Sequence, residues 1–367
     1  MKFTIQREQL LKPLQQTTRT ISNKPLLPII NNILLQVSQG TLWLTSTDLE
    51  IEMQTYIKLI QPHKEGGITV PARKLLEICK CLPLNSNIIV TVQKQQILLT
   101  SGYSKFYLST LAADNFPHLD SFDSEIELTI KQNIMKYLIE STYFSMARQD
   151  VRYYLNGLLL EINGVQLATV ATDGHRLAFC KSIVSKSFSL TSIILPRKTV
   201  LEILRLLENN DQLLKLQISK NNIRIYLNHC IITSRIIDGK FPNYHTVLQN
   251  NYDKLIIVQA DLLKLSLYRA SILANERLNG VCLDLQPNML KITATNMEQE
   301  KSEEIVDIDY QGKCLSIIIN VKYILDVLKN FNSEKIRILF RDSQSSIKIE
   351  RVTSNSDNMY VIMPMQL

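Results

Sequence analysis

Two kinds of apolar periodicity alternate along the chain. Stretches 2–5, 33–37 and 41–46 alternate apolar with polar residues or are rich in β-branched and aromatic ones, which is typical of strands. Stretches 7–16 and 72–82 instead place apolar residues at the spacing of one helix face. The order strand, helix, several strands then occurs again. The pattern predicts an α+β fold assembled from βαβββ halves.

The same pattern returns at a fixed interval. One set of landmarks lies 125 and then 123 residues apart: Thr47-Asp48, Thr172-Asp173 and Thr295-Asn296. A second set, within the helical patterns, lies 125 and then 124 residues apart: Leu76-Glu77-Ile78, Leu201-Glu202-Ile203 and Leu325-Asp326-Val327. Two independent sets with one period indicate a threefold repeat. We therefore expect three domains, at residues 1–125, 126–253 and 254–367, each made of two βαβββ halves.

Length and composition agree with a globular chain. The 367 residues suffice for two or three domains, and 45% apolar content excludes a disordered or fibrous protein. No apolar stretch approaches the roughly 18 residues of a membrane span, and Arg7, Glu8 and Lys12 interrupt the start where a signal peptide is apolar. The six cysteines are scattered, which argues against a zinc site or a disulfide framework. We expect a cytoplasmic protein with no metal and no cofactor.

The positive charge is uneven. Net charge is +7, and the middle third carries 15 basic against 10 acidic residues, whereas the last third has 14 of each. Basic residues on helices can contact phosphate without reading base sequence, although they can equally be a solvated surface. The middle third is thus the first candidate for a nucleic-acid contact, with Arg197 and Lys198 at the start of a predicted helix.

One short string resembles catalytic machinery. Asp173, His175 and Arg176 lie within four residues and raise the alternative of a hydrolase or metal site. The other four histidines are dispersed, and the first repeat has Thr47-Asp48 at the corresponding place. The Thr-Asp pair is therefore interpreted as structural, and catalysis as the weaker hypothesis.

Six stretches in order identify a family. The chain resembles the bacterial DNA polymerase III beta subunit, the DNA sliding clamp, from Met1 to Leu367. The stretches are MKFTIQREQLLKPLQQ, VPARK, FSMARQDVRYYLNG, VATDGHRLA, DGKFPNY and VIMPMQL. The resemblance implies a non-enzymatic processivity factor: a head-to-tail homodimeric ring with helices inside and sheets outside, which encircles duplex DNA. It also implies the polymerase III alpha subunit, the delta subunit of the clamp loader, and other repair and replication proteins as partners.

The resemblance also assigns residues. Those implied to touch DNA are Lys24, Arg73, Gln149, Tyr153 and Tyr154. Those implied to line an apolar groove for partner peptides are Leu155, Thr172, Gly174, His175, Arg176, Leu177, Pro242, Val247, Val361, Ile362, Met363, Pro364 and Met365. Those implied to anchor the dimer interface are Phe106, Ile272 and Leu273.

Several positions depart from the family pattern. Lys24 replaces a frequent Arg, which keeps the charge without the bidentate fork. Gln96 and Tyr103 stand where relatives tend to carry basic residues, which predicts a weaker electrostatic contribution to the dimer. Thr246 and Gln366 likewise replace basic residues and predict less positive charge at the rim of the groove. A basic scaffold that does not close into a ring is a further alternative, which the threefold repeat disfavours.

Overall fold

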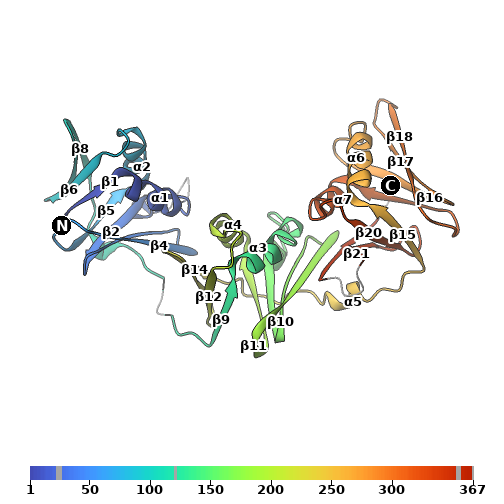
Figure 1. The fold of residues 1–367 in the computed structure, drawn as a ribbon, viewed down its shortest axis with the longest axis horizontal. Helices are drawn as coiled ribbons and strands as arrows, with labels where there is room; N and C mark the ends of the chain where they lie inside the picture. Colours follow the sequence, from blue (N-terminus) through green and yellow to red (C-terminus); the bar gives the residue numbers. More distant parts are fainter. Residues whose placement is uncertain (22–26, 120–121, 353–356, 366–367) are drawn as a thin grey trace. The chain divides into compact units, whose positions relative to one another are not determined.

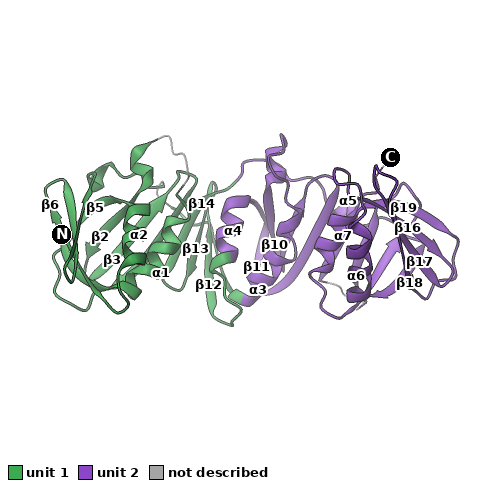
Figure 2. Cartoon of the chain, turned by 90° about the horizontal axis from the view of Figure 1, so that it is seen from above, with its two compact units in different colours: residues 1–132, 205–236 green, residues 133–204, 237–367 purple. Residues whose placement is uncertain are grey.

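The computed structural model describes residues 1–21, 27–119, 122–352 and 357–365 (Figure 1). The chain divides into two compact units (Figure 2). Unit 1 comprises residues 1–132 and 205–236, and unit 2 comprises residues 133–204 and 237–367.

The first repeat contains the predicted pair of βαβββ halves. Its helices are α1 (Arg7–Thr18) and α2 (Ala72–Cys81), which confirm the two helical patterns to within a turn. Leu10, Leu14 and Thr17 form the buried face of α1. The strands are β1 (Lys2–Gln6), β2 (Asn32–Ser38), β3 (Thr41–Thr47), β4 (Ile51–Lys58), β5 (Gly66–Pro71), β6 (Asn87–Gln93), β7 (Gln96–Ser101) and β8 (Ser104–Ser109).

The middle repeat keeps this order with one difference. Its elements are β9 (Ile126–Lys131), α3 (Gln132–Glu140), β10 (Gly157–Thr172), β11 (Arg176–Pro196), α4 (Arg197–Leu206), β12 (Leu213–Ile218), β13 (Asn222–Leu227) and β14 (Cys230–Arg235). The long strands β10 and β11 replace four shorter ones. The register of their pairing shifts on both sides of Gly164, whose φ is +60°. The strand pairing of the repeat is therefore preserved, although strands that are separate in the first repeat are continuous here.

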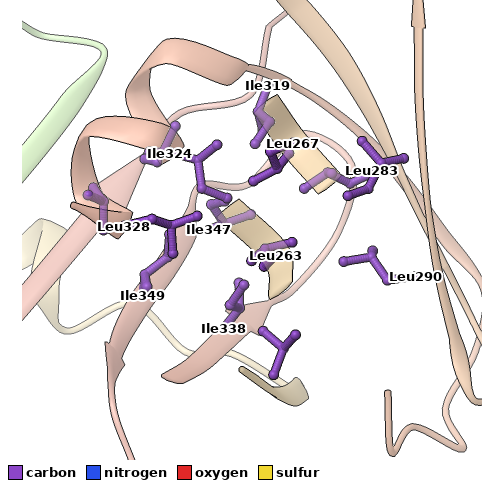
Figure 3. Close-up of a cluster of buried hydrophobic side chains, with 14 of the residues drawn as sticks. Leu263, Leu267, Leu283, Leu290, Ile319, Ile324, Leu328, Ile338, Ile347 and Ile349 are labelled. Atoms are coloured by element: carbon purple, nitrogen blue, oxygen red, sulfur yellow. The ribbon is translucent and has the colours of Figure 1, made fainter. Parts of the chain in front are cut away.

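The third repeat returns to separate strands. Its elements are a short helix α5 (His245–Leu248), β15 (Lys254–Gln259), α6 (Ala260–Ser271), β16 (Gly280–Gln286), β17 (Met289–Thr295), β18 (Lys301–Asp307), β19 (Leu315–Asn320), α7 (Val321–Leu328), β20 (Lys335–Phe340), β21 (Ile347–Arg351) and β22 (Asn358–Ile362). Figure 3 shows its core, where Leu263 and Leu267 of α6 and Ile324 of α7 lie among side chains from the strands. The helices are held by the apolar faces of these sheets.

Sheets join neighbouring repeats. In unit 1, β4 of the first repeat pairs with β14 of the middle repeat, which builds a sheet in the order β5-β2-β3-β4-β14-β13-β12-β9. In unit 2, β11 pairs with β22 of the third repeat, within the sheet β10-β11-β22-β21-β20-β15. Each unit also has a four-stranded sheet, β1-β6-β7-β8 in unit 1 and β18-β17-β16-β19 in unit 2. The compact units follow these shared sheets, so they do not coincide with the three repeats.

Candidate functional site

The turn at residues 172–177 in unit 2 is closed by its own side chains. The Thr172 hydroxyl accepts the N–H of Gly174 at 3.1 Å and donates to the carbonyl oxygen of Arg176 at 2.6 Å. The Asp173 carboxylate accepts the N–H groups of His175 and Arg176 at 2.9 and 3.0 Å. Gly174 has a φ of +90°, a conformation that costs glycine little. Thr172 and Asp173 therefore shape the turn.

The first repeat builds the same turn. There the Thr47 hydroxyl accepts the N–H of Leu49 at 3.1 Å and donates to the carbonyl of Ile51 at 3.1 Å. Asp48 accepts the N–H groups of Glu50 and Ile51 at 3.0 and 2.8 Å. Because the Thr-Asp bonds recur in a turn without histidine or arginine, they need no catalytic explanation.

Arg176 is the central side chain of the 172–177 turn. It is only 11% exposed and pairs with Asp173 at 3.0 Å and with Asp326 of α7 at 2.9 Å. It also donates to the carbonyl oxygen of Phe144, and its guanidinium lies 4.5 Å from the ring centroid of Tyr323. Burial would raise the pKa of Asp326, but hydrogen bonds from Arg176 and Lys329 hold that pKa below its ordinary value. Arg176 therefore ties the turn to α7.

The C-terminal segment lies against this turn. Pairing of β11 with β22 sets Arg176 opposite Ile362 and Leu177 opposite Val361. The N–H of Met363 then donates to the carbonyl oxygen of His175 at 2.9 Å. Residues almost 190 positions apart in the sequence are thus brought together by one antiparallel pair.

Most predicted groove residues come together here, with different exposure. Leu155, Thr172, Leu177, Val361 and Ile362 are buried. Met363 is 46% exposed. Gly174, His175 and Pro242 are exposed, whereas Val247, Pro364 and Met365 are half-buried. The exposed members are available for contact, whereas Val247 packs against the cluster of Leu177 and Val361, and the Met365 side chain lies beside Gly280. Gln366 lies outside the described residues.

Segment 149–154 lies beside the turn. Arg152 donates to both carboxylate oxygens of Asp150, at 3.0 and 2.9 Å, and to the carbonyl oxygen of Asp173 at 3.4 Å. These hydrogen bonds lower the pKa of Asp150 to about 2. A Cβ atom on Gly174 would lie 2.9 Å from the Arg152 guanidinium, so this glycine permits the close approach. The segment predicted to contact DNA is therefore adjacent to the 172–177 turn, which is predicted to contact partner peptides.

The predicted DNA contacts differ in setting. Gln149 is exposed with φ +56°, and Tyr153 is 57% exposed, next to the half-buried Tyr154. Arg197 donates to the carbonyl of Met146 at 3.3 Å; burial, and then the charge of Arg148, lower its pKa. Lys198 is half-buried at the start of α4, and Arg73 is exposed on α2 of unit 1. Lys24 lies outside the described residues.

Sequence reasoning missed the supports of this site. Arg152, Phe144, Tyr323 and Asp326 hold the 172–177 turn. Phe144 and Arg152 belong to the stretch FSMARQDVRYYLNG, but no pattern in the sequence connects any of the four with this turn. Asp326 was visible only as a landmark of the repeat, where Glu77 and Glu202 occupy the corresponding positions. Asp326 and Arg176 lie 150 residues apart in the sequence, so no local sequence pattern indicates that they pair.

Of the residues predicted for the dimer interface, Phe106 lies on a sheet-edge strand, and Ile272 and Leu273 follow a helix that packs beside another edge strand. Phe106 is on β8, which pairs only with β7 among the described residues of its sheet. Ile272, 70% exposed, and Leu273 directly follow α6, which packs beside β18. Within the described part of the chain, β18 pairs with β17 alone.

The described residues provide neither a metal site nor a membrane span. They contain no group of three or more His, Cys, Asp or Glu side chains that could hold a metal ion. None of their helices is long and apolar enough to cross a membrane.

Family models match the three repeats in order. Those of the N-terminal, central and C-terminal domains of the DNA polymerase III beta subunit match residues 1–120, 129–243 and 245–366. This chain belongs to the DNA polymerase III beta subunit family. It is 51% identical to the beta sliding clamps of Escherichia coli K12 and Salmonella typhimurium, over the whole of both chains. It also matches a crystal structure of the DNA polymerase III subunit beta from Pseudomonas aeruginosa, with a TM-score of 0.97, 43% identity and full coverage of both chains.

Membership of this family decides the function. The chain is a sliding clamp of DNA replication, a processivity factor without catalytic activity, as the sequence predicted. The three-domain α+β fold is confirmed as well. The hydrolase alternative built on Asp173, His175 and Arg176 is wrong, because their bonds serve the turn and its anchorage to α7.

Proposed function

We propose that two copies of this chain close head to tail into a ring around duplex DNA. The repeat supports this. Each repeat has a first and a second βαβββ half. The strand that ends the first half of one repeat pairs with the strand that ends the second half of the next repeat, as β4 does with β14 and β11 with β22. The two remaining strands of this kind are β18 and β8, and both are sheet edges in the described chain. A third junction of the same type, made between two copies, would pair β18 of one with β8 of the other.

Side chains near these two edges support the same contact. Ile272, Ile305 and Phe106 offer apolar surface, and Ile305 of β18 is 60% exposed. Glu303 and Glu304 lie on β18, whereas Lys94 and Lys105 lie at or near β8. Glu303 and Glu304 already pair with basic residues of their own unit, and Gln96 and Tyr103 add no charge. The ring is therefore held mainly by apolar contact and strand pairing.

Within the ring, we propose that basic and polar side chains contact DNA phosphates. Arg73, Gln149, Tyr153 and Tyr154 take this role, with Lys24, Arg197 and Lys198 adding charge. Contacts to phosphate carry no base information, so the protein can slide. The domain limits remain those proposed from the sequence, 1–125, 126–253 and 254–367, and the protein would work in the bacterial cytoplasm, where the chromosome is.

The surface around the 172–177 turn and Met363 is proposed to capture short apolar peptides of partners. The flexible thioethers of Met363 and Met365 suit several different peptides. The polymerase III alpha subunit and the delta subunit of the clamp loader are the leading partners, with other clamp-binding proteins beside them.

A topological experiment tests the ring. The protein is loaded onto nicked circular duplex with a bacterial clamp loader and ATP, washed in high salt, and the DNA is then linearised. Retention on the circle and release from the linear product are expected. Equal loss from both at high salt would show a purely electrostatic grip and would contradict the ring.

A peptide-binding experiment tests the partner surface. The probe is a fluorescently labelled short apolar peptide from the polymerase III alpha subunit. Met363→Glu places a charge beside His175 and should weaken binding of this peptide at least tenfold in fluorescence anisotropy. Leu84→Glu, at a residue of unit 1 that is 75% exposed, is the matched control and should bind normally. Equal weakening in both proteins, or in neither, would contradict the assignment.

A further inference from the structure

A cavity in unit 1 lies away from every residue assigned above. Its volume is about 610 Å³, within the usual range of small-ligand sites of roughly 300–1,000 Å³. It is bounded by α1, the end of β4, the start of the α4–β12 connection and the β13–β14 turn. All these elements belong to one compact unit, so the cavity is a property of that unit alone.

An aromatic pair forms one wall. The rings of Tyr56 and His229 are 5.2 Å apart and nearly perpendicular. Tyr56 is held in place because its N–H donates to the carbonyl of His229 at 3.2 Å and its hydroxyl to the carbonyl of Asn228 at 3.4 Å. A fixed aromatic side chain bordering an open cavity offers a stacking surface for a flat ring.

The fold itself does not require this aromatic pair. In unit 2 the corresponding backbone bond runs from the N–H of Lys181 to the carbonyl of Asp357, at 2.9 Å. The same connection is therefore made there by a lysine and an aspartate. Tyr56 and His229 are therefore side-chain choices particular to unit 1, where the Tyr56 ring also packs against Trp43 with 5.1 Å between ring centroids.

The charges around the cavity favour an anion. The Glu8 carboxylate accepts the N–H of Asn85, which lowers its pKa, and it also pairs with Arg7 at 3.0 Å. Glu208 accepts a hydrogen bond from Asn210 at 3.0 Å. The ammonium groups of Lys12 and Lys58 make no hydrogen bond or ion pair with any residue that the structure describes, and both side chains are exposed at the cavity. The ammonium groups of Lys12 and Lys58 are thus available to an anionic ligand, whereas the carboxylates of Glu8 and Glu208 already have partners.

Neutral polar groups complete the lining. The side-chain amides of Gln9, Gln16 and Asn228 can both donate and accept. Pro13, within α1, has no N–H, so the carbonyl oxygen of Gln9 lacks its usual helical donor and can accept from a ligand. These groups suit the edge of a heterocyclic base.

From these observations we propose that the cavity binds a nucleotide, with its base against Tyr56 and its phosphate between Lys12 and Lys58. The same chemistry would serve a free nucleotide or one nucleotide of a single strand. The site is independent of the ring and of the partner surface, because all its parts lie in unit 1 and none belongs to the proposed DNA or peptide contacts.

The test measures binding of two probes, dTTP and the oligonucleotide (dT)6, to the full-length protein by calorimetry. Saturable binding is expected. Lys12→Gln/Lys58→Gln should weaken it at least tenfold, and Tyr56→Leu by about 5- to 140-fold, the range found for loss of base–aromatic stacking. Lys2→Gln/Lys64→Gln removes the same charge elsewhere in unit 1 and should leave binding unchanged. Tighter binding of (dT)6 would indicate a strand as the ligand, and equal or tighter binding of dTTP a free nucleotide.

A second measurement places the ligand. In NMR spectra of the five histidines, dTTP should shift the ring signals of His229 and leave those of His63 and His245 in place. No saturable binding of either probe, equal weakening by both lysine pairs, or an unmoved His229 signal would overturn the proposal. Capture of an acidic peptide through Lys12 and Lys58, without nucleotide binding, would overturn it too. None of these results bears on ring closure, which the loading experiment tests separately.

Discussion

The N–H of Met363 donates to the carbonyl oxygen of His175 at 2.9 Å, and the N–H of Arg235 donates to that of Glu50 at the same distance. These two bonds occupy corresponding places in two junctions between repeats. The backbone architecture is therefore the same at both, while the side chains differ. At the junction in unit 2 the turn presents Gly174, His175 and Arg176 beside a tail rich in methionine, and this combination makes it the candidate partner site.

Arg176→Ala should destabilise unit 2. The substitution leaves Asp173 and Asp326 without their shared cation in a largely buried setting, which is expected to lower the free energy of unfolding by about 3 kcal/mol. Urea denaturation measures the change. Lys329→Ala removes a different, exposed partner of the same Asp326 carboxylate and should change the free energy by less than about 0.5 kcal/mol. Equal effects would contradict the anchoring role of Arg176.

The carboxyl group of Asp150 should titrate at about pH 2, below its ordinary value of 3.8, because Arg152 donates to both its oxygens. A lowered carboxyl pKa stabilises the folded state above about pH 4, and that contribution is lost as the pH falls toward 2. Carboxyl ¹³C chemical shifts report the titration. In Arg152→Ala the midpoint should rise toward 3.8, while Asp253, whose pKa is lowered by Lys254, should not change. Identical Asp150 titrations in both proteins would exclude the pairing.

Gly157→Ala should destabilise the sheet of unit 2. An added Cβ would lie 2.6 Å from both the Ile194 side chain and the Leu195 carbonyl oxygen, neither of which can move without disturbing the β10–β11 pair. A loss of about 2–3 kcal/mol is expected from thermal or urea unfolding. Gly164→Ala meets no atom within 4 Å and should cost only about 1 kcal/mol, from its φ of +60°. The reverse order of effects would contradict the packing described.

Ile272→Asp should weaken the proposed ring. The substitution places a charge on apolar surface beside β18, and light scattering should find the 42.2 kDa monomer at concentrations where the unmodified chain has twice that mass. Ile60 is 91% exposed in unit 1, so Ile60→Asp serves as the control and should remain dimeric. A dimeric Ile272→Asp protein would place the interface elsewhere.

Arg73→Gln should reduce the salt dependence of duplex binding. Loss of one phosphate contact lowers the slope of log K against log salt by about 0.9, without changing preference among DNA sequences. Titrations of fluorescent duplex at several salt concentrations measure the slope. Lys64→Gln, at an exposed residue outside the proposed contacts, should leave the slope unchanged. A sequence-dependent loss for Arg73→Gln would indicate base contact instead.

The sequence by itself determined the repeat, the βαβββ order and the helices α1 and α2. Apolar spacing and the 124-residue period depend only on the order of residues along the chain. The Thr-Asp turns were also predictable, since each closes through bonds spanning four residues at most. Only the tertiary structure decided which repeats share a sheet, because cross-strand pairs such as Leu177–Val361 leave no local pattern. The Arg176–Asp326 pair, the close fit of Arg152 over Gly174 and the cavity beside Tyr56 were equally hidden, since each depends on side chains brought together from distant parts of the chain.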